Sequence, residues 1–327
     1  MRQPAFWTAG RGGWRQALLT PAAGIFQLAT GLRRKLATPW QAPLPVICVG
    51  NVTAGGAGKT PVALDIGRHL LSKDRRCHFL SRGYGGTATG PVQVDPATHT
   101  ATGVGDEPLL LAAVAPTWVA ADRAAGIQRA ATAGADIIVM DDGFQNPGVT
   151  KDLSLLVIDG GFGVGNASVM PAGPLREPLA AALARAHAVV FIGADVTGLL
   201  PDLPATLPVL RASIRPATAA APVRPVLAFA GIGRPEKFFE TLMNAGYQIA
   251  ETVAFADHHP FSTTDLDDLR RRAANLEADL ITTEKDLARL APSERAGIVA
   301  LTVTLQWDDE TALDSVLESC FPHAAAP

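Results

Sequence analysis

The chain has 327 residues, of which 48% are hydrophobic and 18% are charged, enough apolar material for one large domain or two ordinary ones. This composition excludes a disordered chain, and the net charge of −3 gives no reason to expect a nucleic-acid partner. The three cysteines are odd in number, widely spaced and in no metal-ligand pattern, so we expect reduced thiols at Cys48, Cys77 and Cys320.

The N-terminal segment combines basic and apolar side chains. Residues 1–64 contain no acidic residue but seven basic ones: Arg2, Arg11, Arg15, Arg33, Arg34, Lys35 and Lys59. The longest uncharged run covers residues 16–32, which is shorter than the roughly 20 apolar residues of a spanning helix and is interrupted by proline and glycine. We therefore do not expect this run to span a membrane, and we expect no secretion signal. Two interpretations of residues 1–40 stay open: an interfacial helical segment on an anionic membrane, or a helix packed on the protein's own core.

A phosphate-binding loop is the strongest local signal. Residues 44–50 predict a buried strand and residues 61–72 have helical spacing, with a glycine-rich stretch between them. Its glycines allow successive N–H groups to turn toward phosphate oxygens, Lys59 can reach the outer phosphates, and the Thr60 hydroxyl can ligate Mg²⁺. The usual first glycine is Thr53 here, so a glycine-rich turn with an incidental lysine is the alternative. We expect the nucleotide to contact Thr53, Ala54, Gly55, Gly56, Ala57, Gly58, Lys59 and Thr60.

Short apolar runs then alternate with helix-length segments. We predict strands at residues 77–80, 118–120, 136–140, 153–159 and 188–192, and helices at residues 107–115 and 123–133. This alternation is typical of a parallel sheet covered by helices on both faces.

Two acidic motifs lie in this region. Asp141 and Asp142 come at the end of the strand predicted at residues 136–140, where ligands bind in open α/β sheets. They could place a carboxylate beside the metal of a nucleotide, or they could cap the next element. Asp106 and Glu107, in the sequence GDEP, stand at the start of a predicted helix. A kinase needs a carboxylate to orient or deprotonate the attacking hydroxyl, and helix capping by Asp106 is the equally weighted alternative.

The stretch at residues 195–225 is rich in proline, and we expect the connection between two domains there. Beyond it, strands at residues 225–230, 247–254 and 279–282 and helices at 235–245, 263–276 and 284–290 predict a smaller α/β unit. This unit carries FADHHP, whose two histidines could serve acid–base chemistry, while no cysteine cluster or HxxxH spacing supports zinc. Two other charged loops, Arg82 in SRGYGG and Arg176 with Glu177 in MPAGPLREP, could touch phosphate or metal or be only turns.

Taken together, these motifs resemble a known family. GNVTAGGAGKTP, LSRGYGG, GDEP, DDGFQ, GPLRE, FADHH and ITTEKD occur in the order typical of tetraacyldisaccharide 4′-kinases, the lipid A 4′-kinases of Gram-negative bacteria. The resemblance covers the chain from about residue 4 to about residue 290, and the family's loop also lacks the first consensus glycine.

The resemblance implies a reaction, a fold and a location. The reaction is ATP- and Mg²⁺-dependent phosphorylation of the 4′-hydroxyl of a tetraacylated glucosamine disaccharide 1-phosphate, forming lipid IVA. The fold is α/β, with a P-loop NTPase-like, mostly parallel sheet, a smaller α/β domain and a membrane-associating N-terminal helical segment. The location is the cytoplasmic face of the bacterial inner membrane, peripheral or monotopic. We therefore favour interfacial binding by residues 7–35, and we expect a monomer whose partners are the lipid substrate and the membrane surface.

The resemblance also implies domain limits and residue roles. We predict an N-terminal interfacial segment at residues 1–40, a kinase domain at 41–215 and a smaller C-terminal domain at 222–327. The family's catalytic Asp–His pair maps onto the GDEP and DHH motifs, where we select His258 over His259. Catalytic roles are therefore predicted for Asp106, His258 and Lys59, and metal binding for Thr60, Asp141, Asp142 and Glu177.

Three other functions fit parts of the sequence. A P-loop ATPase or GTPase switch needs no DHH domain, and the chain has no Asn-Lys-x-Asp motif for guanine. A soluble small-metabolite kinase needs no acid-free, aromatic N-terminus. A non-catalytic membrane scaffold leaves the nucleotide loop unexplained.

Overall fold

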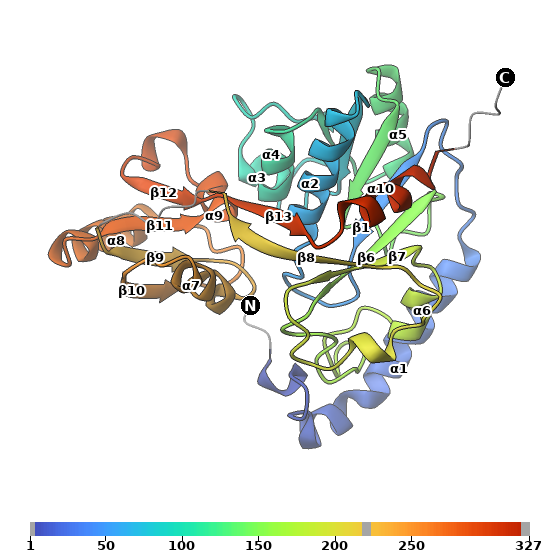
Figure 1. Ribbon diagram of the computed structural model, residues 1–327, viewed down its shortest axis with the longest axis horizontal. Helices are drawn as coiled ribbons and strands as arrows, with labels where there is room; N and C mark the ends of the chain where they lie inside the picture. Colours follow the sequence, from blue (N-terminus) through green and yellow to red (C-terminus); the bar gives the residue numbers. More distant parts are fainter. Residues whose placement is uncertain (1–3, 218–223, 322–327) are drawn as a thin grey trace.

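The computed structural model describes residues 4–217 and 224–321. Two α/β units lie side by side, the larger on the right of Figure 1 and the smaller on the left. The larger unit is built on a nine-stranded sheet and the smaller on a four-stranded sheet. The mostly parallel α/β fold with a second, smaller unit is therefore confirmed.

The large sheet runs in the order β13-β8-β7-β6-β1-β5-β2-β4-β3 and is parallel except for its two edge pairs, β13 with β8 and β3 with β4. Because successive side chains of a strand point to opposite faces, β1 supplies Ile47 and Val49 to one core cluster and Cys48 to another. The strands predicted at residues 153–159 and 188–192 match at both ends. The strands are β1 (Val46–Gly50), β2 (Cys77–Ser81), β3 (Val92–Gln93), β4 (Thr117–Val119), β5 (Ile137–Asp141), β6 (Leu153–Asp159), β7 (Ala188–Ile192), β8 (Val209–Pro216) and β13 (Val303–Trp307).

Helices cover both faces of this sheet, as predicted. Residues of α2, α4 and α10 belong to the core cluster of one face, and residues of α5, α6 and α1 pack against the strands on the other. These helices are α1 (Gly13–Leu36), α2 (Lys59–Ser72), α3 (Ala101–Val104), α4 (Asp106–Ala112), α5 (Arg123–Thr132), α6 (Leu179–Leu183) and α10 (Glu310–Glu318). The three cysteines are free and buried.

The smaller unit is a parallel sheet in the order β10-β9-β11-β12, with α7 and α8 packed against it. Helix α8 begins with a capping box in which Ser262 and Asp265 each accept a hydrogen bond from the other's backbone. The elements are β9 (Val226–Ala230), α7 (Pro235–Asn244), β10 (Ile249–Ala254), α8 (Thr263–Asn275), β11 (Asp279–Thr283), α9 (Glu284–Arg289) and β12 (Ile298–Leu301).

Two strands that link the units correct the predicted domain limits (Figure 1). Strand β13 pairs antiparallel with β8 in the large sheet, and α10 packs Leu313 and Leu317 into the core of the larger unit. Residues 303–321 therefore belong to the larger unit and not to a C-terminal domain at 222–327; residue 222 itself lies outside the described residues. Strand β8 forms within the proline-rich stretch at residues 195–225. Pro208 precedes it and Pro216 ends it, so neither removes an interior N–H donor.

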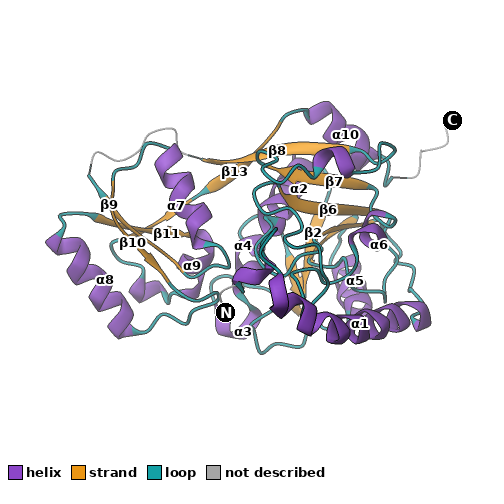
Figure 2. Ribbon diagram, turned by 90° about the horizontal axis from the view of Figure 1, so that it is seen from below, coloured by secondary structure: helices purple, strands orange, loops and turns teal. Residues whose placement is uncertain are grey.

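Helix α1 is a single 24-residue helix that continues through Pro21 and lies along the larger unit (Figure 2). Ala23 is its one buried residue, Phe26 packs partly against the core, and Gln16 Nε2 donates to Ser168 Oγ at 2.8 Å. Among the described helices, none combines the length and the apolar character needed to cross a bilayer. Large apolar side chains of α1 remain exposed: Trp14, Leu18, Ile25, Leu28, Leu32 and Leu36.

Candidate active site

The phosphate-binding loop connects β1 to α2 at the carboxyl edge of the large sheet. Gly58, which caps α2, has a φ of 89°, a left-handed conformation that favours glycine. Residues 174–175 hold the start of the loop in place: Ala54 N donates to Pro174 O at 2.7 Å, and Thr53 forms a β-bridge with Leu175. The first turn of α2 thus presents its free N–H groups beside Lys59, an arrangement that binds anions.

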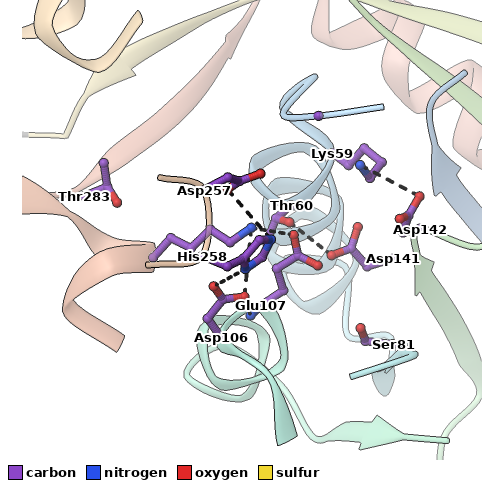
Figure 3. A network of polar contacts seen from close by, with 12 residues as sticks. Lys59, Thr60, Ser81, Asp106, Glu107, Asp141, Asp142, Asp257, His258 and Thr283 are labelled. Carbon is purple, nitrogen blue, oxygen red and sulfur yellow. Dashed lines mark hydrogen bonds and ion pairs between the residues drawn. The ribbon is translucent and has the colours of Figure 1, made fainter. Parts of the chain in front are cut away.

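Carboxylates at the end of β5 face this loop (Figure 3). Thr60 Oγ1 donates to Asp141 Oδ2 at 3.1 Å, and Lys59 Nζ lies 3.8 Å from Asp142 Oδ1. Arg176 Nη1 also donates to Asp142 Oδ1, at 2.9 Å. Burial acts to raise the pKa of Asp142, but the positive charges of Lys59 and Arg176 outweigh it and lower the pKa. Asp142 is therefore an ionised carboxylate fixed beside the phosphate loop.

Asp141 behaves in the opposite way. Burial, assisted by the negative charge of Glu107, raises the pKa of Asp141 to about 7. Its Oδ1 atom is buried and has no hydrogen-bond partner among the described residues. An unpartnered carboxylate oxygen next to a threonine hydroxyl suits Mg²⁺, which takes one or two protein carboxylates together with phosphate oxygens and waters. Among the described residues, no group of three or more His, Cys, Asp or Glu side chains is placed to hold a metal ion.

Glu177, also predicted to bind metal, has different surroundings. Its Oε2 atom lies 2.7 Å from Arg34 Nη2 and 2.8 Å from Arg185 Nη2, and its Oε1 accepts from Gln145 Nε2 at 3.2 Å. The carboxylate is buried, so these partners offset its charge and attach α1 to the larger unit. Both oxygens are engaged, and the metal-binding role of Glu177 stays a prediction.

Asp106 and His258 meet across the boundary between the two units. Asp106 is the first residue of α4, His258 follows β10, and His258 Nδ1 lies 3.2 Å from Asp106 Oδ2 (Figure 3). His258 has a φ of 56°, a conformation uncommon for a residue with a side chain. His259 instead contacts Asp265 at 3.1 Å within the smaller unit. Of the two histidines, the structure therefore brings His258 to Asp106.

Asp106 is buried and carries further partners that the sequence did not predict. Arg289 Nε donates to Asp106 Oδ2 at 2.7 Å, and Lys285 Nζ donates to the neighbouring Glu107 at 2.8 Å. Burial acts to raise the pKa of Asp106, but the hydrogen bond from His258 and the charges of Lys285 and Arg289 hold it well below its usual range. Asp106 is therefore ionised at any physiological pH. Its Oδ1 accepts from the N–H of Glu107 at 2.8 Å, so the carboxylate also binds its own helix end, although Gly105 is the N-cap.

One cleft of about 530 Å³ is lined by the loop and by His258, the member of this contact that the smaller unit supplies. The larger unit lines it with residues 54–61, Tyr84, Glu107 and Asp142, and the smaller unit with Gly233, Asp257, His258 and Lys285. Tyr84, in the SRGYGG turn, stacks obliquely on His258 with ring centres 5.3 Å apart. A nucleotide held by the loop would therefore share one cavity with His258, whose ring contacts Asp106, and group transfer requires such closeness of the reacting groups.

A second cavity of about 260 Å³ lies between α1 and the charged loops. Arg33, Arg34 and Arg176 supply positive charge to it, and Phe26 and Met170 supply apolar surface. It thus combines a wall of basic side chains with a hydrophobic one next to the exposed helix.

Known proteins resemble this chain over nearly its full length. Residues 15–321 match the family model described as Tetraacyldisaccharide-1-P 4′-kinase. A tetraacyldisaccharide 4′-kinase of Gluconacetobacter diazotrophicus is 53% identical over 328 residues, covering 100% of both chains, and that of Rhodospirillum centenum is 54% identical over 327 residues, covering 97% of this chain and 96% of the other. A crystal structure of LpxK from Aquifex aeolicus in complex with ATP has a TM-score of 0.75 and 26% identity, and covers 94% of this chain and 99% of that one. The chain therefore belongs to the tetraacyldisaccharide-1-phosphate 4′-kinase family.

Proposed function

We propose that this protein transfers the γ-phosphoryl group of ATP, with Mg²⁺, to the 4′-hydroxyl of a tetraacyldisaccharide 1-phosphate, forming lipid IVA. The observation that carries the proposal is the shared cleft, which is lined by a phosphate-binding loop from one unit and by His258 from the other, and His258 contacts the buried Asp106. A nucleotide switch protein has no use for the second of these features.

The residues of the cleft account for the chemistry. Lys59 and the loop N–H groups hold the outer phosphates, and Mg²⁺ held by Thr60 and the β5 carboxylates would offset their charge. The acceptor oxygen attacks the γ-phosphorus, and the bond between the γ-phosphorus and the β–γ bridging oxygen breaks. ADP leaves with that oxygen, and the proton of the acceptor hydroxyl passes to Asp106. Because its pKa is held low, Asp106 contributes more by orienting the hydroxyl than by removing its proton early, which suits a loose phosphoryl-transfer transition state.

The position of His258 explains the need for two units. It reaches Asp106 from the smaller unit, so the site is complete only when the units are in contact. We expect the protein to function as a monomer.

Helix α1 supports attachment to the cytoplasmic face of the inner membrane, where ATP is available. Leu18, Leu28 and Leu32 are 70%, 75% and 58% exposed, and Arg33, Arg34 and Lys35 lie in the last turn of the helix. Apolar faces flanked by basic residues bind anionic interfaces. The adjacent basic and apolar cavity would receive the headgroup of a lipid that stays in the bilayer.

The activity is tested by incubating the protein with γ-labelled ATP, Mg²⁺ and the acylated disaccharide 1-phosphate in detergent. We expect the label in the lipid, on the 4′ oxygen by ³¹P NMR. Free labelled phosphate without labelled lipid would support the switch protein, and a labelled water-soluble acceptor would support a small-metabolite kinase.

Membrane attachment is tested by sedimentation with phosphatidylglycerol vesicles. We expect Leu18→Ser, Leu28→Ser and Leu32→Ser together to lower the bound fraction. A control with Val196→Ser and Val299→Ser, which are 76% and 58% exposed outside α1, should bind as wild type. Equal binding by both variants would contradict the role of α1.

A further inference from the structure

The ITTEKD motif has no role in the mechanism described so far. It covers the end of β11 and the start of α9, a short helix that packs against α4 at the boundary between the units. Arg289, the last residue of α9, lies one turn after Asp286 of the motif. These two residues and Asp106 form a connected set of charges.

Asp286 is fully buried in the smaller unit and is held on several sides. Its two oxygens each lie 3.1 Å from Gly231 N, and Thr283 Oγ1 donates to Oδ2 at 2.7 Å. The Asp286 N–H in turn bonds Thr283 Oγ1 at 3.0 Å. The carboxylate therefore has little freedom to move, and it needs a positive partner to offset its buried charge.

Arg289 supplies that partner and uses the rest of its guanidinium across the boundary. Nη1 donates to Asp286 Oδ1 at 2.6 Å and to Gly231 O at 2.7 Å. Nε donates to Asp106 Oδ2 at 2.7 Å, and Nη2 lies 2.5 Å from the same oxygen. The side chain is 8% exposed. Because the guanidinium is planar, the two acceptors bound by Nη1 fix the direction in which Nε and Nη2 point.

The oxygen that Arg289 binds is the one that faces His258. Asp106 Oδ2 accepts from Arg289 and lies 3.2 Å from His258 Nδ1, while Oδ1 is turned toward the Glu107 N–H. Without Arg289, the Glu107 N–H would still hold Oδ1, but Oδ2 would keep only its contact with His258, which is itself 31% exposed. The guanidinium thus fixes Oδ2 beside the histidine.

We propose that Arg289, anchored by Asp286, is the positioning residue that orients Asp106 toward His258 when the two units are in contact. The inference rests on the proposed kinase function. It assigns Asp286 and Arg289 to turnover and not to nucleotide binding, because the polar contacts of Arg289 are with Asp106, His258, Asp286 and Gly231 and not with the phosphate-binding loop. A misplacement of a catalytic group by about 1 Å can cost on the order of a hundredfold in rate.

The test compares R289M, R289K, D286N and the double variant R289M/D286N in the lipid-labelling assay. The control is R271M, because Arg271 is 72% exposed and forms an ion pair with Asp268 in α8. We expect R289M to lower kcat by roughly tenfold to a hundredfold while the Kd for ATP stays within about threefold. R289K should recover part of the loss, since an ammonium group cannot satisfy Asp106, Asp286 and Gly231 at once. D286N should also lower kcat, and the double variant should lose no more than the larger single loss, because Asp286 acts through Arg289.

Several results would overturn the proposal: a kcat for R289M equal to that of R271M, full activity in R289K, losses that multiply in the double variant, or a weakened ATP affinity that accounts for the loss. Thermal unfolding checks folding. If R289M does not fold, R289K and D286N carry the same readouts, and wild-type kcat in both would refute the inference. If the wild type itself labels no lipid, the proposed function fails and the inference with it; if the wild type is active and the variants are unaffected, only the inference fails.

Discussion

The phosphate-binding loop and the Asp106–His258 contact are built in opposite ways. The loop is made from consecutive residues between one strand and one helix, and its position is set by the unit that contains it. The contact joins residues 152 positions apart that belong to different units. The difference leads to a prediction: the phosphate-binding loop of the larger unit should set most of the nucleotide affinity, whereas turnover should need both units.

The largest effect should come from the contact. D106N keeps the shape of the side chain but loses its charge, so we expect kcat to fall about 10²- to 10⁴-fold. The Kd for ATP should stay within about threefold, because Asp106 lies outside the loop. Stopped-assay kinetics and equilibrium ATP binding measure the two quantities. H259N is the matched control, since His259 faces Asp265. Weak ATP binding with normal turnover of bound ATP would reverse the assignment.

A loop variant should affect both quantities. K59M removes the cation that faces the outer phosphates and Asp142, so we expect kcat/KM to fall by about 10²- to 10³-fold, with weaker ATP binding contributing to the loss. K73M, at the other end of α2 and 42% exposed, is the control. If K59M bound ATP as tightly as wild type and lost only kcat, the loop and the contact would not be separable in this way.

These two regions also differ in what the sequence could predict. The loop was found because its chemistry is local: glycines, a lysine and a threonine between an apolar run and a helical one. Asp106 could be flagged only as an acid near a helix start, with capping as the equal alternative, and the structure shows that it makes a helix-end hydrogen bond as well as the contact with His258. Residues 106 and 258 could be paired only through the family resemblance.

Arg289 had no signal of its own. An arginine in the last turn of a short helix is ordinary, because it complements the partial negative charge of the helix end. Only the packing of α9 on α4 reveals its contact with Asp106.

Long-range pairing was also the part of the fold that the sequence could not predict. The strands buried on both faces, such as β6 and β7, were predicted to the residue because a continuous apolar run marks them. Strands β8 and β13 have weaker patterns, and no local feature says that residues after the second unit return to the first sheet. The same limit explains why α1 could not be assigned to a surface from its composition alone.

The metal side of the loop should show a pH dependence that the contact lacks. Burial and Glu107 raise the pKa of Asp141 to about 7, so the carboxyl is protonated below that pH and must lose its proton to bind Mg²⁺. We therefore expect the apparent Mg²⁺ affinity to fall by up to about tenfold per pH unit below pH 7 and to level off above it. Mg²⁺ titrations of ATP turnover between pH 5.5 and 8.5, values chosen to bracket about 7, measure this. D141N is the control. It should bind Mg²⁺ weakly because it lacks the carboxylate, and its Mg²⁺ affinity should change with pH only through the titration of the nucleotide itself. An equally steep pH dependence of the Mg²⁺ affinity in D141N would contradict the assignment.

The smallest effect should distinguish two glycines within the loop. Gly58 has a φ of 89°, and a Cβ there would lie 2.6 Å from Ile192 Cδ1, whereas a Cβ on Gly56 would meet nothing within 4 Å. Because the Ile192 methyl group is the far end of a flexible side chain, the strained backbone sets most of the cost, and we expect Gly58→Ala to lower the free energy of unfolding by about 1–2 kcal/mol. Gly56→Ala should change it by less than about 0.5 kcal/mol, as at a surface position. Denaturant unfolding of the nucleotide-free protein measures both. If both variants lost the same free energy of unfolding, the left-handed conformation of Gly58 would not be present in the nucleotide-free protein. The loop would then take its shape only when phosphate is bound.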